Sequence, residues 1–394
     1  MNARPKKSSE ALAESQAEVR RREPLGPPDP RPHRVPPGER VLMAGNEAAG
    51  EAAIRAGCRF YFGYPITPQN ELTEYMAREM SLAGGTFIQA ESELAAINMV
   101  YGASAAGVRA MTTSSSPGIS LKQEGISYLA GSELPAVIIN IQRGGPGLGD
   151  IGPAQSDYFQ ATRGGGHGDY RTIVLAPASV QEMADLVMLA FHLADKYRNP
   201  VLVLADAQLG QMMEPLAFTE PPDEPLPAKD WALTGARGRA SRIVKSFYWL
   251  PGALEEFNRR LAEKYARIEE AEVRAEAVHC EDARWVLVAY GSAARVCEQV
   301  VVEARGRAAP VGLLRPITLW PYPTGEVQEL AERVQGFLVV EMSRGQMVED
   351  VRLAVEGRVP VEFFGRTGGG IPTAEQVGLA LERLMGDTTA EGER

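Results

Sequence analysis

Glu93 is the first residue whose surroundings suggest chemistry. It precedes the uncharged run LAAINMVYGA at residues 94–103, which has the composition of a helix without a polar face. A carboxylate at the head of such a helix carries a desolvation cost unless a partner holds it, and this is typical of a functional acid. The alternative is an acid that complements the helix dipole, a role that Glu91 fits better. The sequence leaves both roles open for Glu93.

Arg143 and Thr67 are two further candidates, each placed just after a β-type run. Arg143 follows the apolar residues 136–141 and precedes a glycine loop, so its guanidinium could clamp a carboxylate. A surface ion pair is the less favoured alternative. Thr67 lies in YPITP, where two prolines fix the backbone and could aim its hydroxyl, although the spacing alone favours a rigid turn. His167 lies among glycines, and we assign it no chemistry.

Short apolar runs that alternate with helical patterns must position these side chains. The runs predict strands at 58–64, 86–91, 109–115, 135–142, 171–179 and 200–210. Helices are predicted at 91–106 and at 180–196, the second with Ser179 as N-cap. Strands alternating with helices imply a parallel sheet, and such sheets bind ligands at the carboxyl ends of their strands. The candidate residues lie in loops at those ends.

A second α/β pattern begins near residue 283. Between the two patterns lie a proline- and acid-rich linker and a charged helix predicted at 254–277. We therefore expect a flexible Pro-rich extension at 1–38, a first domain at 39–215, a linker with a charged helix at 216–282 and a second domain at 283–386. The expected fold class is α/β, with two doubly wound domains.

The composition excludes several classes of protein. The 394 residues are 44% hydrophobic and 23% charged, as in globular chains, and no apolar run approaches the ~18 residues of a membrane span. The start lacks an apolar secretory segment. The net charge is −10, although residues 1–40 hold nine Lys or Arg against six acids. An acidic body disfavours nucleic acid as a partner, and the arginine triplet at 20–22 is better explained as part of a solvated extension.

Cysteine and glycine patterns limit the cofactors that this chain could hold alone. The three cysteines are Cys58, Cys280 and Cys297, and none forms a C-x-x-C pair, so we expect a reducing cytoplasm and neither an iron–sulfur cluster nor a zinc site on this chain. The four histidines are scattered, and we expect no protein-only metal site. The glycine-rich loops match neither the dinucleotide-binding nor the P-loop pattern.

Five motifs together resemble the alpha subunit of the 2-oxoacid:ferredoxin oxidoreductases. They are YPITP at 64–68, ExELAAINM at 91–99, TTSSSPGISL at 112–121, QRGGPG at 142–147 and GGGHGDY at 164–170. The resemblance covers 42–215 strongly and 283–386 more weakly. It implies a pyrimidine-binding domain of the thiamine-diphosphate enzymes, followed by a domain similar to the transketolase C-terminal domain.

The resemblance also implies residue roles. Glu93 matches the glutamate that hydrogen-bonds the aminopyrimidine ring nitrogen of thiamine diphosphate. Thr67 matches the threonine beside cofactor and substrate, with Tyr64, Pro65 and Ile66 in the same cofactor-binding motif, and Arg143 matches the arginine that binds the substrate carboxylate. The implied reaction is oxidative decarboxylation of a 2-oxoacid to acyl-coenzyme A and carbon dioxide, with electrons leaving through iron–sulfur clusters to ferredoxin.

Two absences assign part of this chemistry to other chains. The G-D-G signature that binds diphosphate and magnesium is missing, which places these groups on a beta subunit. The cysteine count places the iron–sulfur clusters on further chains, namely gamma and ferredoxin-like delta subunits. We expect this polypeptide to supply half of an active site, with neither nucleic acid nor membrane as a partner.

The loop after Arg143 bears on the substrate. Family members that act on 2-oxoglutarate usually read GPSTGxPT there, whereas this chain reads GPGLGDIGP, with Leu148 and Gly152 at the threonine places. Loss of hydroxyls and gain of a leucine favour an apolar substrate side chain. The pattern resembles the 2-oxoisovalerate, or branched-chain, type, with 3-methyl-2-oxobutanoate as substrate. The alternatives are a 2-oxoglutarate, pyruvate or aryl 2-oxoacid member, and a non-catalytic scaffold subunit.

Overall fold

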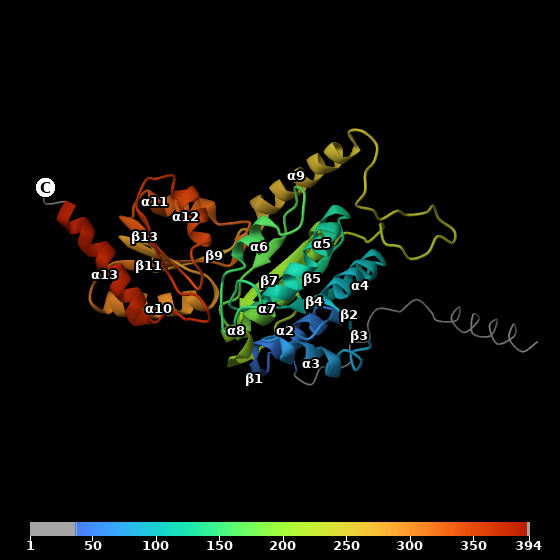
Figure 1. Ribbon diagram of the computed structural model, residues 1–394, viewed down its shortest axis with the longest axis horizontal. Coiled ribbons are helices and arrows are strands. Elements are labelled where there is room, and N and C mark those ends of the chain that lie inside the picture. The colour runs from blue at the N-terminus through green and yellow to red at the C-terminus, as the bar shows by residue number, and fades with distance from the viewer. Residues whose placement is uncertain (1–35, 37, 392–394) are drawn as a thin grey trace, which may run out of the picture. The chain divides into compact units, whose positions relative to one another are not determined.

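The computed structural model describes residue 36 and residues 38–391 (Figure 1). The extension predicted at 1–38 lies, apart from residues 36 and 38, outside the described residues. Within the described part, the strands form a seven-stranded sheet, a five-stranded sheet and a two-stranded ribbon. Helices lie against both larger sheets (Figure 1).

The seven-stranded sheet belongs to the first domain and has the strand order β12-β6-β7-β5-β4-β2-β3. Neighbouring strands are parallel except β12, which pairs antiparallel with β6. Its strands are β2 (Phe60–Gly63), β3 (Thr86–Gln89), β4 (Ala110–Ser114), β5 (Ala136–Gln142), β6 (Ile173–Leu175), β7 (Pro200–Asp206) and β12 (Thr318–Trp320). Every residue of β4, β5 and β7 is buried, because helices cover both faces of a parallel sheet.

The helices of the first domain pack in two groups. α2 packs against both α3 and α7, while α4 packs against α5. Their bounds are α2 (Gly45–Arg55), α3 (Asn70–Glu79), α4 (Glu93–Ala105), α5 (Ser116–Gly131), α6 (Tyr158–Arg163), α7 (Val180–Tyr197) and α8 (Ala207–Gln211). β1 (Arg40–Ala44) and β8 (Met213–Ala217) form the antiparallel ribbon at the two ends of this domain.

Side-chain caps set where the two predicted helices begin. The Ser179 hydroxyl accepts the backbone N–H of Glu182 at 3.1 Å, and α7 begins at the next residue, Val180. This confirms Ser179 as the N-cap. Ser92 caps α4 in the same way by accepting the N–H of Ala95 at 3.1 Å. Glu93 is thereby fixed as the first residue of its helix.

The five-stranded sheet belongs to the second domain and has the order β14-β13-β10-β11-β9. It contains β9 (Ala275–Val278), β10 (Trp285–Val288), β11 (Val311–Pro316), β13 (Gly336–Glu341) and β14 (Val361–Gly365). Its helices are α10 (Gly291–Gly306), α11 (Thr324–Ala331), α12 (Met347–Val355) and α13 (Ala374–Glu391). Apolar side chains of β10, β11, β13, α10 and α13 share one buried core.

Two strands, β9 and β12, belong to sheets that the predicted domain boundaries would not give them. The charged helix α9 (Ala253–Ala271) ends before residue 277, because the chain turns at 272–274 into β9, which pairs antiparallel with β11. The predicted linker at 216–282 therefore contributes a strand to the second sheet. In the other direction, β12 from the second half of the chain joins the first sheet. The predicted fold class, two doubly wound α/β domains, is confirmed, and the boundaries 39–215 and 283–386 stay predictions.

The two sheets are linked by buried polar contacts. The Asp350 carboxylate on α12 accepts a hydrogen bond from Tyr158 and another from Arg163 at 2.7 Å, both on α6. The side chain of Gln155 donates to the carbonyl of Tyr290 at 2.8 Å and accepts the N–H of Met342 at 3.0 Å. These contacts join the segment that follows β5 to the segments that follow β10 and β13.

Candidate functional site

The loops that carry the predicted site residues lie at one edge of the first sheet. The strands β3, β2, β4 and β5 are neighbours and run parallel, so the segments that follow them emerge side by side. These segments hold, in that order, Glu93, Thr67, residues 115–118 and Arg143. Residues far apart in sequence are brought together by sheet order alone.

Arg143 links two of the motif loops. Its guanidinium donates one hydrogen bond to the carbonyl of Thr67 at 3.0 Å and another to the carbonyl of Leu148 at 2.9 Å. The side chain is buried, and its Nε has no hydrogen-bond partner among the described residues. The Thr67 hydroxyl accepts a hydrogen bond from Asn70 at 3.2 Å. The guanidinium is therefore oriented by backbone groups, and its Nε donor stays unused.

The remaining residues of YPITP and the 144–152 loop surround this contact. Tyr64 and Ile66 are half-buried and Pro65 is exposed. The Leu148 side chain is 81% exposed, and Gly152 donates its N–H to Asp150 at 3.4 Å. The loop closes on itself through the N–H of Gly144, which donates to the carbonyl of Gly152 at 3.0 Å. The backbone carbonyl of Leu148 thus accepts a hydrogen bond from the Arg143 guanidinium, while the Leu148 side chain is in solvent.

Glu93 lies at the junction of α4 and α5, next to a glycine. It is only 7% exposed. A Cβ added to Gly118 would lie 2.8 Å from Glu93 Oε1 and 2.0 Å from Ser114 Oγ. The absence of a side chain at Gly118 is what leaves space for the Glu93 carboxylate. The Ser114 hydroxyl near Gly118 and the hydroxyl of the next residue, Ser115, are buried without a hydrogen-bond partner among the described residues.

Lys122 is a buried cation that the sequence interpretation did not single out. It lies on α5, one helical turn after Gly118, and donates to the backbone carbonyl of Glu93 at 3.4 Å. Burial lowers the pKa of Lys122 to about 8, and the negative charge of Glu93 opposes this shift. A lysine directly after the small and apolar residues of the SPGISL segment at 116–121 was a signal that could have revealed it.

Asp157 organises the start of α5 from the other side. Its carboxylate accepts hydrogen bonds from Ser116 at 2.6 Å and from Asn140 at 2.8 Å. Burial raises the pKa of Asp157, although both hydrogen bonds oppose that shift. Ser116 in turn accepts the N–H of Arg143 at 3.0 Å. The network connects the start of α5 to Arg143, and sequence patterns gave no sign of it.

A cavity of about 420 Å³ opens beside the Arg143 loop. The first domain lines it with Gly144, Gly145, Pro146, Ala154, Ser156 and Asp157, and the second domain with Met342, Arg344, Gln346, Thr367 and Gly368. Loops at the carboxyl ends of β5, β13 and β14 therefore share one cavity. It is adjacent to the predicted site residues.

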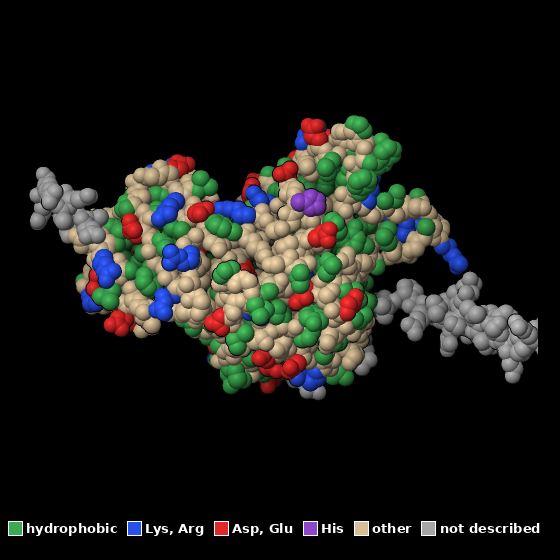
Figure 2. Space-filling view, viewed as in Figure 1, with side chains coloured by type: hydrophobic (Ala, Val, Ile, Leu, Met, Phe, Trp, Pro, Cys, Tyr) green, Lys and Arg blue, Asp and Glu red, His purple; other side chains and the backbone are tan. Residues whose placement is uncertain are grey.

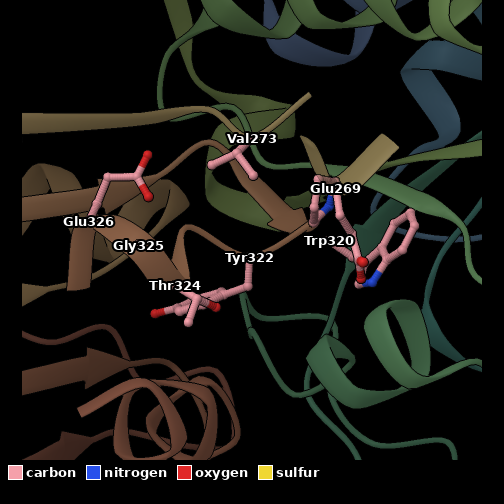
Figure 3. Close-up of a pocket in the computed structure, with 8 residues that line it drawn as sticks. Glu269, Val273, Trp320, Tyr322, Thr324, Gly325 and Glu326 are labelled. Carbon is pink, nitrogen blue, oxygen red and sulfur yellow. The ribbon is translucent and has the colours of Figure 1, made fainter. Parts of the chain in front are cut away.

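Another pocket lies between the end of α9 and the connection from β12 to α11 (Figure 3). It measures about 320 Å³ and contains none of the motif residues. Glu269 and Glu326 lie on opposite sides of Tyr322 in this view (Figure 3). Since the motif residues at the carboxyl ends of β2, β3, β4 and β5 are absent from this pocket, we take those strand ends as the candidate site.

The surface near the candidate site is partly apolar. Leu94 on α4 and Leu121 on α5 are exposed, and hydrophobic side chains are frequent over these helices and at the far end of α9 (Figure 2). Within residues 38–391, no group of three or more His, Cys, Asp or Glu side chains is arranged to hold a metal ion. In the part of the chain that the structure describes, no helix has the length and apolar character needed to cross a membrane.

Comparison with known proteins decides the family. Residues 51–246 match the thiamine-diphosphate-binding domain of pyruvate flavodoxin/ferredoxin oxidoreductases, and residues 283–377 match core domain II of pyruvate:ferredoxin oxidoreductase. The chain is 55% identical over 348 residues to the ketoisovalerate oxidoreductase subunit VorB of Methanothermobacter thermautotrophicus, covering 88% of this chain and 99% of that protein. The chain belongs to the 2-oxoacid:ferredoxin oxidoreductase family. Its relatives are named as subunits, which implies partner chains.

Other relatives and solved structures are less similar to this chain. The 2-oxoglutarate synthase subunit KorA of Archaeoglobus fulgidus is 39% identical over 335 residues, covering 83% of this chain and 95% of that protein. A solved 2-oxoglutarate:ferredoxin oxidoreductase from Magnetococcus marinus superposes with a TM-score of 0.79 at 26% identity, covering 95% of this chain and 70% of that chain. A split-gene transketolase shares the fold, with a TM-score of 0.54 at 14% identity, covering 86% of this chain and 97% of that chain.

Proposed function

We propose that this chain is the alpha-type subunit of a complex that oxidatively decarboxylates 3-methyl-2-oxobutanoate. The products are the branched acyl-coenzyme A and carbon dioxide, and the electrons reduce ferredoxin. The observation that carries the proposal is the 55% identity across 99% of a ketoisovalerate oxidoreductase subunit, against 39% for a 2-oxoglutarate synthase subunit.

Glu93 and its neighbours fit the aminopyrimidine side of thiamine diphosphate. A buried carboxylate beside Gly118 can hydrogen-bond a ring nitrogen, and the unpartnered Ser114 and Ser115 hydroxyls add polar groups at the same wall. When bound, thiamine diphosphate supplies the carbon nucleophile and electron sink that decarboxylation of a 2-oxoacid requires. Glu93 would hold a proton at the ring nitrogen, and the YPITP residues 64–67 would border the cofactor.

Arg143 and Thr67 are suited to bind the 2-oxoacid. The unused Nε of Arg143 is a charged donor that can pair with a carboxylate, and the guanidinium is already oriented by the carbonyls of Thr67 and Leu148. Leu148 and Gly152 would border the apolar side chain of the substrate. The exposed Leu148 side chain supports this role, because it is available to contact a substrate or a partner chain.

The complex supplies what this chain lacks. A beta subunit would hold the diphosphate and magnesium, gamma and ferredoxin-like delta subunits would complete the assembly with its iron–sulfur clusters, and coenzyme A would accept the acyl group. The exposed leucines on α4 and α5, beside Glu93, support an apolar partner surface near the cofactor. Location in the cytoplasm remains part of the proposal.

A substrate panel tests the proposal. The reconstituted complex is assayed at equal concentrations of 3-methyl-2-oxobutanoate, 2-oxoglutarate, pyruvate and an aryl 2-oxoacid, with reduction of ferredoxin as readout. We expect the highest kcat/KM for 3-methyl-2-oxobutanoate. A complex that turns over 2-oxoglutarate far faster would overturn the branched-chain assignment and favour the 2-oxoglutarate alternative.

A variant at Leu148 tests whether this residue determines the substrate preference. Leu148→Thr restores a hydroxyl at an exposed position and should raise kcat/KM for 2-oxoglutarate relative to 3-methyl-2-oxobutanoate by about tenfold. Gly152 stays unchanged, because a Cβ there would lie 2.7 Å from the Cα of Gly369. An unchanged ratio would remove Leu148 from the substrate site.

A further inference from the structure

Gln346, the residue before α12, binds the backbone on both sides of Asp157. Its side chain donates to the carbonyl of Ser156 at 2.7 Å and accepts the N–H of Phe159 at 2.8 Å. Its own backbone N–H donates to the buried carboxylate of Glu341 at 3.1 Å, which holds Gln346 near the end of β13. The second domain therefore fixes the chain immediately before and after Asp157.

Gln155 is a second anchor of the same segment. Its side chain is 0% exposed and accepts the N–H of Met342 at 3.0 Å, while its backbone N–H donates to the carbonyl of Met342 at 2.8 Å. Its side-chain amide also donates to the carbonyl of Tyr290 at 2.8 Å. A shift of residues 155–159 away from the second domain would leave these buried groups unpaired, which is costly. The segment is therefore bound firmly to the second domain.

The side chain of Asp157 binds the first domain instead. Its Oδ2 accepts a hydrogen bond from the Ser116 hydroxyl at 2.6 Å and another from the Asn140 amide at 2.8 Å. The backbone N–H of Asp157 donates to the side chain of Gln142 at 3.0 Å. Asn140 and Gln142 lie on β5, directly before Arg143, and both are buried. Asp157 thus joins the second domain to the strand that leads into Arg143.

The bond from Ser116 to Asp157 determines how Ser116 contacts Arg143. A hydroxyl carries one proton and can donate only once. With its proton on the Asp157 carboxylate, the Ser116 oxygen accepts the N–H of Arg143 at 3.0 Å. Without that carboxylate, the hydroxyl keeps only the Arg143 carbonyl, at 3.3 Å, as an acceptor among the described residues. Asp157 therefore sets the position of the hydroxyl and, through it, of the Arg143 backbone.

We propose that Asp157 is a positioning residue for Arg143, which connects the second domain to the arginine that binds the carboxylate of the 2-oxoacid. This inference rests on the proposed function, because that function gives Arg143 its substrate. Asp157 acts through Ser116 and Arg143 and has no contact with substrate in this account. The second domain then contributes to substrate binding through Gln346, without a side chain that touches the substrate.

The test compares Asp157→Asn with Asp157→Leu in the co-expressed complex. The asparagine carbonyl oxygen can still accept from both Ser116 and Asn140, whereas leucine has a similar size and no acceptor. We expect Asp157→Leu to raise the KM for 3-methyl-2-oxobutanoate about tenfold, with kcat within about twofold of wild type, and Asp157→Asn to stay within about threefold in both. A wild-type KM in Asp157→Leu, or an equal rise in both variants, overturns the inference.

A double-mutant cycle tests whether Asp157 acts through Arg143. Arg143→Ala removes the guanidinium that Asp157 would position, and kcat/KM is still measurable as the slope at low substrate concentration. Adding Asp157→Leu to Arg143→Ala should change kcat/KM by less than about twofold, compared with about tenfold in the wild-type background. A tenfold loss in both backgrounds would show that Asp157 acts independently of Arg143, and the inference would be wrong.

Hydrogen–deuterium exchange gives a readout that does not depend on activity. The bond to Ser116 protects the Arg143 N–H, so peptides that contain residues 142–148 should exchange at least about threefold faster in Asp157→Leu than in wild type. Gln346→Met removes both bonds of that side chain to the segment and should give the same change. It keeps the inference testable if Asp157→Leu fails to assemble. Unchanged exchange in these variants contradicts the inference.

Tyr158→Phe is the matched control. Tyr158 is the neighbour of Asp157 and also binds the second domain, through Asp350, but its hydroxyl contacts neither Ser116 nor Arg143. The variant keeps the ring, and it should lower stability while leaving the KM and the exchange of residues 142–148 unchanged. Effects in Tyr158→Phe equal to those in Asp157→Leu would indicate a general loosening between the domains and overturn the inference.

The variants also separate this inference from the proposed function. If Arg143→Ala retains the wild-type KM, the proposed substrate role of Arg143 fails. If Arg143→Ala raises the KM and Asp157→Leu does not, only the role of Asp157 fails.

Discussion

Arg143 is oriented entirely by the backbone of two loops, through its bonds to the carbonyls of Thr67 and Leu148. Lysine has neither the planar fork nor the reach to satisfy both carbonyls and a substrate carboxylate. We predict that Arg143→Lys raises the KM for the 2-oxoacid by about 10- to 100-fold, a loss of about 1.5–3 kcal/mol. Steady-state kinetics of the complex measures this. A KM within twofold of wild type would contradict the role of Arg143.

Gly118 is the residue that leaves room for the Glu93 carboxylate. Because its added Cβ would collide with Glu93 and Ser114, we predict that Gly118→Ala destabilises the first domain by about 1–3 kcal/mol and weakens binding of thiamine diphosphate to the complex by at least about tenfold. Urea unfolding measures the first effect and calorimetric titration the second.

Gly102 on α4 is the control for that substitution. A Cβ there meets nothing within 4 Å, so Gly102→Ala should stabilise the helix by up to about 1 kcal/mol and leave cofactor affinity unchanged. If Gly102→Ala and Gly118→Ala weakened binding of thiamine diphosphate equally, the loss in Gly118→Ala would not be caused by a collision of the added Cβ with Glu93.

At the scale of elements, the N-cap of α4 links helix stability to the candidate site. Ser92 caps α4 and Ser179 caps α7, each through one hydrogen bond of 3.1 Å. We predict that either serine changed to alanine costs about 1 kcal/mol of unfolding free energy. Only Ser92→Ala should also weaken binding of thiamine diphosphate, because Glu93 is the next residue. Thermal unfolding and cofactor titration separate the two effects, and affinity losses of the same size in both variants would oppose the assignment.

Local patterns predicted most of the elements that position the site. The apolar runs and the cap at Ser179 correspond to strands and a helix of the structure, because they depend on neighbours in sequence. The strand β9 was mistaken for the end of a helix, since residues 275–278 carry no apolar run and are a strand only through pairing with β11. The return of β12 to the first sheet has the same cause. Such long-range pairing is invisible to local periodicity.

The residues of the candidate site also fall into two groups, those that the sequence pointed to and those that only the structure reveals. Thr67, Glu93 and Arg143 were singled out by their local context, and the resemblance to the family supplied their expected roles. Lys122 and Gly118 were not, because their importance arises from how closely α5 approaches α4, which is a property of packing. The residue roles themselves stay predictions.

At the scale of the whole molecule, the cysteines are buried in both domains. Burial raises the pKa of Cys58 to about 12, that of Cys280 to about 11 and that of Cys297 still further. All three side chains therefore stay neutral thiols near neutral pH, and the thiolate is the reactive form. We predict little alkylation of any of them by iodoacetamide in the folded complex up to about pH 9, and rapid alkylation in urea. Mass spectrometry measures this, and fast labelling of folded protein at pH 8 would contradict it.

The central claim is that this chain contributes Glu93 to a shared thiamine-diphosphate site. The most direct measurement is release of carbon dioxide from 3-methyl-2-oxobutanoate by the co-purified complex, compared between wild type and Glu93→Gln, with subunit assembly checked by light scattering. The account predicts that Glu93→Gln assembles normally and loses at least about 100-fold in kcat, within the range by which acid–base groups accelerate reactions. A Glu93→Gln complex with wild-type kcat would contradict the account and favour a scaffold role for the chain.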